Sequence, residues 1–255
     1  MRSVSARPSH DFSRLSSDAM RLRLASYNIQ KAVGLDFRRD PSRILAVIAA
    51  LEADVVVLQE ADKRLGTRPG AIPRFLIEQH TDYVPADVAD SDVSLGWHGN
   101  AILVRRGWRI LQTARFHLPG LEPRGAVMAR IASDASGPAT SGDITVIGTH
   151  LGLLRSWRRR QARALRDHAL GGDCPTTAIA GDLNEWSMRK GLGPLHPTFR
   201  IVSPGRTFPA GRPLGSLDRM ALGRDLKLLD AGVSDGALAR IASDHRPVWA
   251  DIERI

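Results

Sequence analysis

The stretch from Pro175 to Asn184 constrains the fold more than any other part of the chain. It begins with the β-branched and apolar run Pro175-Thr-Thr-Ala-Ile-Ala180 and continues as Gly181-Asp-Leu-Asn184. Because the run is short, apolar and bounded by glycines, it predicts a buried strand. Asp182 and Asn184 follow two residues apart, so an extended chain points both side chains to one side. Such a pair can hold a water molecule, a metal ion or a phosphate oxygen, although Gly-Asp also suits an ordinary turn.

Other predicted buried strands end in the same way. The first two of these strands, predicted over residues 21–27 and 54–58, are separated by a predicted helix. The helix begins at Asp40-Pro41, with aspartate as N-cap and proline at the first helical position. Strands whose ends lie at one edge of a sheet bring the residues after them to one cleft. The strands predicted over residues 21–27, 54–58 and 143–149 are followed by Asn28, Glu60 and His150 respectively.

The segment from Arg155 to Leu170 is predicted as a helix with two different faces. Trp157, Ala164 and Leu165 fall on one side at 3.6 residues per turn. The opposite side carries four arginines: Arg155, Arg159, Arg163 and Arg166. A charged helix face is often only solvated, and the alternative is a surface that contacts a nucleic-acid backbone or anionic lipids.

Length and charge narrow the class of protein. The chain has 255 residues, enough for one large domain, which we place at residues 21–255. Residues 1–20 predict a disordered basic tail, or an upstream start before Met20. The net charge of +9 favours a polyanionic partner (nucleic acid, an anionic membrane surface or a phosphorylated small molecule), unless it only reflects an arginine-rich proteome.

Cysteine content and hydropathy exclude further classes. Cys174 is the only cysteine, so an intrachain disulfide and an all-cysteine metal site are excluded. No apolar run approaches the roughly 20 residues of a membrane span, and the N-terminus lacks the apolar region of a secretory signal. We therefore expect a cytoplasmic protein, and we expect it to be a monomer.

Two later segments complete a set of oxygen and imidazole ligands. Ser216-Leu-Asp-Arg-Met220 carries Asp218, and Ser243-Asp-His-Arg-Pro247 carries Asp244 and His245. Carboxylates and amides dominate the set, which suits Mg²⁺ or Mn²⁺ better than Zn²⁺. In a phosphate-ester hydrolase, Asp218 would orient His245, and Asp182 would take the proton of an attacking water. Each residue alone has an ordinary explanation, such as a turn cap or a surface ion pair.

The order of these motifs resembles that of the endonuclease/exonuclease/phosphatase superfamily. The resemblance covers about residues 21–253 and implies a four-layered α/β sandwich. In that fold two mixed β-sheets pack face to face with helices outside, as in deoxyribonuclease I, and a Mg²⁺-dependent phosphoesterase site lies at one end. The motifs are Ser26-Tyr-Asn-Ile29, Leu58-Gln-Glu60, Gly99-Asn-Ala-Ile-Leu103, Gly148-Thr-His150, Gly181-Asp-Leu-Asn184, Thr207-Phe-Pro209 with Ser216-Leu-Asp-Arg219, and Ser243-Asp-His-Arg-Pro247.

The resemblance also implies residue roles. Glu60 would be the main Mg²⁺ ligand, with Asn28 and Asp244 close to the metal. Asp182 would align or deprotonate the water, Asn184 would contact the scissile phosphate, and His245, oriented by Asp218, would stabilise the transition state. His150 resembles the histidine of the deoxyribonuclease, sphingomyelinase and inositol-phosphatase branches, which argues against abasic-site repair. Arg124 is a candidate phosphate contact, and Arg219 stands where many members have an aromatic residue, which predicts a local difference in the pocket.

Three functions remain open from the sequence. The first is a nuclease acting on DNA or RNA, which the charge and the arginine face favour. The second is a phosphoesterase acting on phospholipids or small molecules such as sugar or inositol phosphates. Short loops favour this second function, as would exposure of Trp97 and Trp157. The third, a binding protein on an inactive hydrolase scaffold, conflicts with the intact set of acidic residues and histidines.

Overall fold

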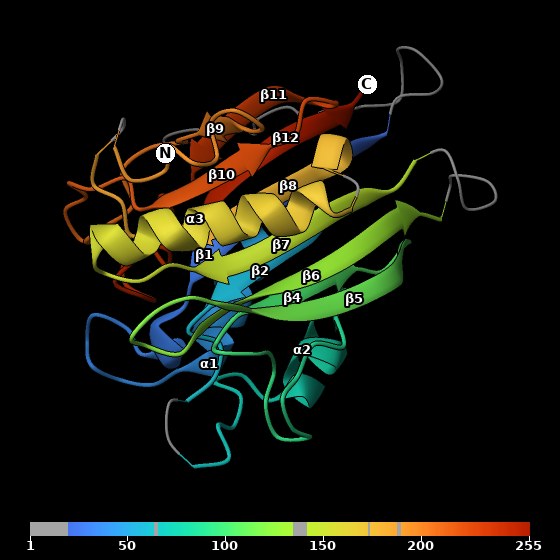
Figure 1. Cartoon of the computed structure of the whole chain (residues 1–255). Coiled ribbons are helices and arrows are strands. Elements are labelled where there is room, and N and C mark those ends of the chain that lie inside the picture. The colour runs from blue at the N-terminus through green and yellow to red at the C-terminus, as the bar shows by residue number, and fades with distance from the viewer. Residues whose placement is uncertain (1–19, 64–65, 135–141, 173, 188–189) are drawn as a thin grey trace, which may run out of the picture.

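Two mixed β-sheets form the centre of the computed structural model, which describes residues 20–63, 66–134, 142–172, 174–187 and 190–255 (Figure 1). Over this part of the chain each sheet has six strands, ordered β11-β12-β1-β2-β4-β3 and β5-β6-β7-β8-β10-β9. The first sheet contains β1 (Arg21–Asn28), β2 (Val55–Gln59), β3 (Tyr83–Pro85), β4 (Ala101–Arg105), β11 (Leu226–Val233) and β12 (Val248–Arg254). The second contains β5 (Trp108–Leu118), β6 (Arg124–Ser133), β7 (Ile144–His150), β8 (Thr177–Asp182), β9 (Arg200–Val202) and β10 (Asp218–Leu222).

Alternation along the strands separates an inner core from two outer ones. In β2, Val57 packs between the sheets, whereas Leu58 packs outward in the cluster that includes α1 (Pro41–Ala50) and α2 (Arg74–His80). In β8, Ala180 points inward and Ile179 packs outward in the cluster that includes α3 (Arg155–Leu170). Successive strand residues face opposite sides of a sheet, so each strand serves two cores. The predicted four-layered α/β sandwich is confirmed.

Each sheet contains one parallel pair of strands next to its centre. β1 runs parallel to β2, and β7 runs parallel to β8, while the other neighbouring strands are antiparallel. The carboxyl ends of all four parallel strands lie at one end of the sandwich, where Asn28 of β1 donates a hydrogen bond to Asp182 of β8. We call this the catalytic end.

The strand that carries Asp182 is shifted from its predicted range. The sequence predicts residues 175–180, whereas β8 spans Thr177–Asp182, because a short 3₁₀ turn, η2 (Cys174–Thr176), precedes it. Asp182 is therefore inside the strand, and it pairs with His150 on β7 and with Asp218 on β10. A Cβ on Gly181 would lie 1.8 Å from the carbonyl oxygen of Thr149, so only glycine permits this close approach.

Helix α3 has the predicted bounds, but its buried face differs from the prediction. Arg158 and Gln161 are buried, whereas Trp157 and Ala164 are only half-buried. Arg158 is buried because it pairs with fully buried Glu185, with Nη2 3.1 Å from Oε2, and donates to the carbonyl oxygen of Gly152. Four arginines were predicted on the opposite, charged face of the helix. Three of them, Arg155, Arg159 and Arg163, are exposed, and Arg166 is half-buried.

Three further features bear on the sequence analysis. Trp97 is buried and Trp157 is half-buried, so exposure of Trp97, which would have favoured the second function, is not found. The carbonyl oxygen of Met20 accepts a hydrogen bond from the backbone of Arg254, and the rest of the predicted tail, residues 1–19, lies outside the described residues. None of the helices in the described part of the chain is long and apolar enough to span a bilayer.

We predict that Arg158→Met lowers the free energy of unfolding by about 3 kcal/mol, because it removes one partner of a buried charge. Urea unfolding followed by circular dichroism measures the change. Arg163→Met on the same helix is the control, since Arg163 is exposed, and we expect it to alter stability by less than about 0.5 kcal/mol. Equal effects of the two substitutions would contradict the structural role of Arg158.

Candidate active site

The carboxylate of Asp182 is the meeting point of the catalytic end. Its Oδ2 accepts a hydrogen bond from Asn28 Nδ2 at 3.1 Å and lies 3.3 Å from His150 Nε2 and 3.7 Å from His245 Nε2. Its Oδ1 accepts from the backbone N–H of Asn184 at 3.0 Å. Because all five residues are buried, these contacts form in a region of low dielectric, where they are strong.

His245 and Asp218 form a buried pair beside this carboxylate. His245 Nδ1 donates to Asp218 Oδ2 at 2.8 Å. Burial acts to lower the pKa of His245, but the charge and hydrogen bond of Asp218, with the charges of Asp182 and Asp244, raise it to about 10. The imidazole is therefore protonated at neutral pH and directs its Nε2–H toward Asp182. The other oxygen of Asp218, Oδ1, is buried and has no hydrogen-bond partner among the described residues.

Glu60 and Asp244 provide a second acidic group next to the first. Glu60 follows β2 and forms an ion pair with Lys31, which lies in the short 3₁₀ helix η1 (Gln30–Ala32) after β1. Burial raises the pKa of Asp244, and the carboxylate of Glu60 raises it further, against the charge of His245. Among the described residues, the one side chain that donates a hydrogen bond to the Asp244 carboxylate is Ser243, whose hydroxyl lies 3.3 Å from Oδ1.

The donor set of this end fits a hard divalent cation. Glu60 and Asp244 repel one another, and a cation between carboxylates removes such repulsion. Oxygen donors of this kind are those that Mg²⁺ and Mn²⁺ prefer. A second possible ligand group is formed by Asp182, Asp218 and His245, whose ligand atoms lie within 4.8 Å of one another. We favour Glu60 and Asp244, since His245 Nδ1 in the second group is already engaged by Asp218 at 2.8 Å.

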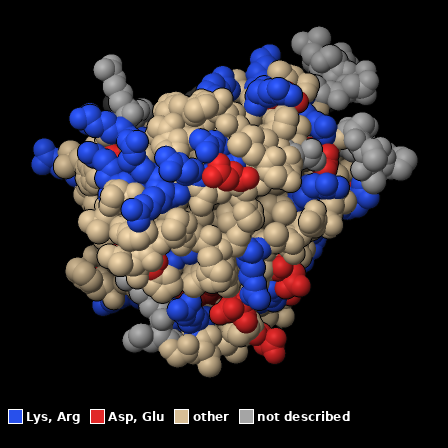
Figure 2. All heavy atoms as spheres, viewed as in Figure 1, with Lys and Arg blue, Asp and Glu red and all other residues tan. Residues whose placement is uncertain are grey.

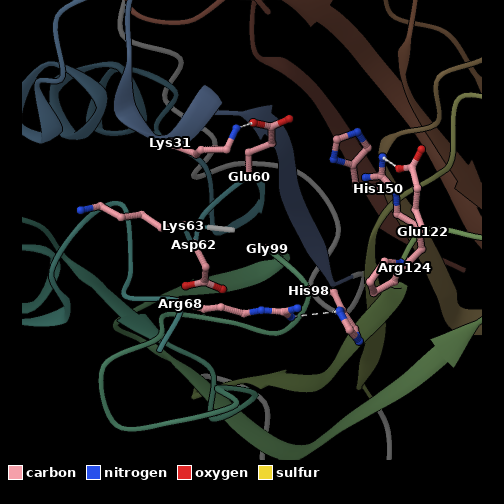
Figure 3. A pocket seen from close by; sticks show the side chains of 11 residues that line it. Lys31, Glu60, Asp62, Lys63, Arg68, His98, Gly99, Glu122, Arg124 and His150 are labelled. Carbon is pink, nitrogen blue, oxygen red and sulfur yellow. Dashed lines mark hydrogen bonds and ion pairs between the residues drawn. The ribbon is translucent and has the colours of Figure 1, made fainter. Parts of the chain in front are cut away.

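A cavity of about 310 Å³ opens beside Glu60 and His150 (Figure 3). In Figure 3, Lys31 and Glu60 lie on one side of it, and His150, Glu122 and Arg124 lie on the other. Arg124 donates to Glu122 at 2.8 Å, and its side chain is mostly buried. The lining is rich in cations and suits an anionic or strongly polar group; it consists of Lys31, Glu60, Asp62, Lys63, Arg68, His98, Gly99, Glu122, Pro123, Arg124 and His150.

Backbone strain concentrates at the same place. Lys31, Glu60, His98 and Asn184 have positive φ values of 56°, 52°, 49° and 51°, in the left-handed region that residues other than glycine rarely adopt. Such conformations each cost on the order of 1–3 kcal/mol and are typical of functional sites. Glu60 and Asn184 follow strands of different sheets, so strained backbone lies on both sheets at the catalytic end.

All nine residues that the sequence analysis selected lie at this end. Asn28, His150, Asp182, Asp218 and His245 are joined by the contacts above, and Asn184 lies on the turn after Asp182. The other three, Glu60, Asp244 and Arg124, lie around them. Arg124 and Glu60 line the cavity, and Asp244 lies close enough to Glu60 for its pKa to respond.

Two residues support the site from behind, and the sequence analysis gave the first another role and did not select the second. Arg219 is fully buried, and its guanidinium donates to the carbonyl oxygens of Ser216, Ser187 and Glu185. It therefore holds the loop that follows Asn184 rather than altering a pocket, as its place in the motif suggests. Lys31, the partner of Glu60, was missed, because nothing in the local sequence distinguishes it from a surface lysine.

Comparisons with known proteins identify the family and the fold of the chain. Residues 25–245 match the Endonuclease/Exonuclease/phosphatase family. The chain is 28% identical over 225 residues to Uncharacterized protein YbhP of Escherichia coli (strain K12), covering 80% of this chain and 85% of that protein.

Two similar solved structures show the same fold. Mannosyl-6-phosphatase Bt3783 of Bacteroides thetaiotaomicron VPI-5482 has a TM-score of 0.69 and 16% identity, covering 91% of this chain and 99% of that one. TDP2 of D. rerio, complexed with a single-strand DNA product, has a TM-score of 0.65 and 16% identity, covering 91% and 98% respectively.

The His245–Asp218 pair predicts a pH dependence of stability in protein kept metal-free with EDTA. The pKa of His245 is higher in the folded than in the unfolded chain, so its contribution is complete below about pH 6.5. As pH rises toward 10, only the unfolded histidine loses its proton, and the contribution declines. Between pH 6.5 and pH 10 we expect the free energy of unfolding of wild type to fall by at least about 1 kcal/mol more than that of His245→Gln. Urea unfolding measures both. Parallel pH profiles for the two proteins would exclude a charged His245 in the folded state.

Proposed function

The chain belongs to the endonuclease/exonuclease/phosphatase family, whose members hydrolyse phosphate esters, and we propose that its residues at the catalytic end direct water onto the phosphorus of a phosphate ester. One observation carries this proposal: a charged imidazole, held by a buried carboxylate at 2.8 Å, faces a second buried carboxylate. The first group supplies a proton or positive charge, and the second accepts a proton. Both are needed to attack phosphorus and expel an alkoxide.

The roles divide between Asp182 and the two histidines. The carboxylate of Asp182 accepts the proton of the attacking water, and the adjacent Asn184 contacts the phosphoryl group. His245 presents its Nε2–H to the oxygens on which negative charge develops, while Asp218 fixes its orientation. His150, on the other side of Asp182, is placed to donate to a phosphoryl oxygen or to the leaving oxygen.

Glu60, Asp244 and Asn28 would hold a divalent cation, and Mg²⁺ is our first choice, with Mn²⁺ as the alternative. Enzymes of this family are generally metal-dependent, and the acidic residues here support that requirement. When bound, such an ion neutralises phosphoryl charge and stabilises the leaving oxygen. Lys31 would orient Glu60, since the two form an ion pair beside the cavity.

We favour a substrate with a compact polar group next to the phosphate, as in a phospholipid or a phosphorylated small molecule. The cavity of about 310 Å³ beside Glu60 and His150 is at the lower end of the size range of small-ligand sites. Its cations Lys63 and Arg68 suit a polar or anionic head group. The sugar phosphatase among the similar structures supports this class.

A nuclease is the second candidate, and the surface charge favours it. Lys and Arg side chains gather on the face where α3 begins (Figure 2). Arg159, Arg160 and Arg163 are exposed there, although Arg155 and Arg158 of the same helix are paired with Glu185. The similar structure of TDP2 with a DNA product supports this candidate as well. A steep fall of affinity with salt on DNA, absent on lipid, would favour the nuclease.

We predict that Asp182→Asn and His245→Ala each lower kcat by about a thousandfold, because each removes a group that acts on the reacting atoms. Hydrolysis of bis(p-nitrophenyl) phosphate measures the reaction independently of the natural substrate. Phospholipid vesicles and supercoiled plasmid are assayed in parallel to separate the two substrate classes.

His80→Ala is the matched control for these variants, because His80 is exposed at the end of α2. We expect it to keep wild-type turnover. Retention of near-normal turnover by Asp182→Asn, with loss in Glu60→Gln, would reverse the division of roles. Plasmid nicking by wild type but not by His245→Ala, without phospholipid turnover, would move the assignment to a nuclease.

Metal removal provides an independent prediction. Treatment with EDTA should abolish turnover, and added Mg²⁺ or Mn²⁺ should restore it, since carboxylates prefer such ions. Glu60→Gln should raise the Mg²⁺ concentration required for half-maximal activity by about tenfold or more. Full activity in EDTA would refute metal dependence. The control is Glu253→Gln, a change at a carboxylate in β12 remote from the site motifs, which should leave the Mg²⁺ concentration for half-maximal activity unchanged.

A further inference from the structure

Loops at the catalytic end expose large apolar side chains to solvent. Among the described residues, seven such side chains are at least 58% exposed, and six of them lie in loops that follow or precede the catalytic strand ends. The seventh is Ile255, the last residue of the chain. The six are Phe37 (91%), Leu121 (80%), Leu153 (66%), Leu214 (62%), Leu154 (58%) and Trp186 (58%). Scattered single apolar residues are ordinary on a protein surface, but a concentration at one end marks an interaction site.

Contacts between the loops connect most of these side chains to their neighbours; Leu121, on the loop between β5 and β6, is not among those connected. The Trp186 ring lies against Gly215 and is 6.3 Å from the ring of Phe208, which is itself 4.8 Å from the ring of His245. Leu35 lies beside Gly211. We call this surface the apolar rim; its members are Leu35, Phe37, Leu153, Leu154, Trp186, Leu214 and Ile241.

The other members of the rim connect through the backbone. Leu35 N–H donates to the carbonyl oxygen of Ile241 at 2.9 Å. Leu153 and Leu154 give their carbonyl oxygens to Arg158, whose partner Glu185 precedes Trp186 in the chain. The rim therefore extends from α3 to the loop before β12 and borders the catalytic histidine.

Arginines interrupt the rim at short intervals. Arg38 follows Phe37, Arg155 follows Leu154, and Arg212 lies two residues before Leu214. Arg38 and Arg212 are exposed and make no ion pair with the described residues. The acidic residues nearby are neutralised within the protein, since Asp36 pairs with Arg43 and Asp235 pairs with Arg240. The rim thus combines apolar side chains with unpaired positive charge.

We propose that the apolar rim docks on an anionic lipid surface and so presents a membrane phospholipid to the catalytic end. Leucine, phenylalanine and tryptophan gain free energy by entering the acyl boundary, and neighbouring arginines gain it from anionic head groups. A nucleic-acid backbone would engage the arginines but would leave the leucines of the rim in water. The proposal rests on the proposed function for the reaction itself and adds the surface from which the substrate comes.

The position of the rim matches the order of groups in a phospholipid. The cavity lies on the side of Glu60 and His150, whereas Trp186 of the rim approaches His245 through the ring of Phe208. The phosphate of a lipid likewise lies between a polar head group and an apolar tail. With phosphorus between His150 and His245, the head group enters the cavity and the tail remains against the rim and the bilayer.

Vesicle co-sedimentation tests docking without any requirement for turnover. Phosphatidylcholine vesicles with and without phosphatidylglycerol are used as the probe, and EDTA is present throughout. The apolar variant is Phe37→Asn with Leu214→Ser; asparagine is chosen because Phe37 has a φ of 60°. The charge variant is Arg38→Gln with Arg212→Gln. We expect each to weaken binding to the anionic vesicles by about tenfold or more.

Matched controls carry the same residue changes elsewhere. Phe75→Asn with Leu170→Ser alters exposed apolar residues on α2 and at the far end of α3, and Arg200→Gln with Arg224→Gln alters exposed arginines on β9 and between β10 and β11. We expect wild-type vesicle binding from both controls. Every variant should retain wild-type hydrolysis of bis(p-nitrophenyl) phosphate, because none of these residues touches the catalytic groups.

The outcomes separate docking from the proposed reaction. Binding that ignores phosphatidylglycerol, or that falls equally in the controls, would overturn the proposal. So would single-stranded DNA binding that depends on Arg38 and Arg212 but not on Phe37, with no vesicle binding. Rim-dependent vesicle binding without hydrolysis of the soluble diester would support docking while refuting the proposed function.

Discussion

The buried carboxylate of Asp182 is the constraint on which the rest of the site depends. Strand pairing places it next to His150 on β7 and Asp218 on β10, so the second sheet fixes three functional residues through backbone register. Asn28, from the first sheet, donates to the same carboxylate. A buried charge is stable only when such partners surround it. The site therefore forms only when the two sheets pack face to face and bring Asn28 to Asp182.

Electrostatics then divides the catalytic end into two parts. Around His245, the imidazole lies beside two carboxylates, Asp218 and Asp182, which raise its pKa and keep it charged. Around Glu60 and Asp244, the negative charges outnumber the single cation of Lys31, and the pKa of Asp244 rises in response. In the proposed function the two parts have different uses: the first would move or hold protons, and the second would hold a divalent cation. Strained backbone at Glu60 and Asn184 maintains both.

The positive net charge has more than one role in this chain. Arg158 and Arg219 are buried, where they neutralise Glu185 and satisfy the carbonyl oxygens of the loop beyond Asn184. They stabilise the scaffold of the site and cannot contact a partner. The exposed arginines that alternate with apolar side chains on the rim have a different character, because charge and apolar area together match a lipid interface better than either does alone. The net charge of the sequence does not distinguish the buried arginines from the exposed ones.

The sequence by itself predicted the four parallel strands, apart from a two-residue shift of β8, and the polar residues at their ends. Alternation and strand-ending residues are local patterns, so Asn28, Glu60, His150 and Asp182 can be identified before any strand is paired, and the motif order indicates the sandwich. Only the tertiary structure decided that Arg158 is buried, that Lys31 pairs with Glu60, that Trp97 is core, and that distant loops form a cavity and an apolar rim. Those properties depend on contacts between segments far apart in the chain, for which periodicity carries no information.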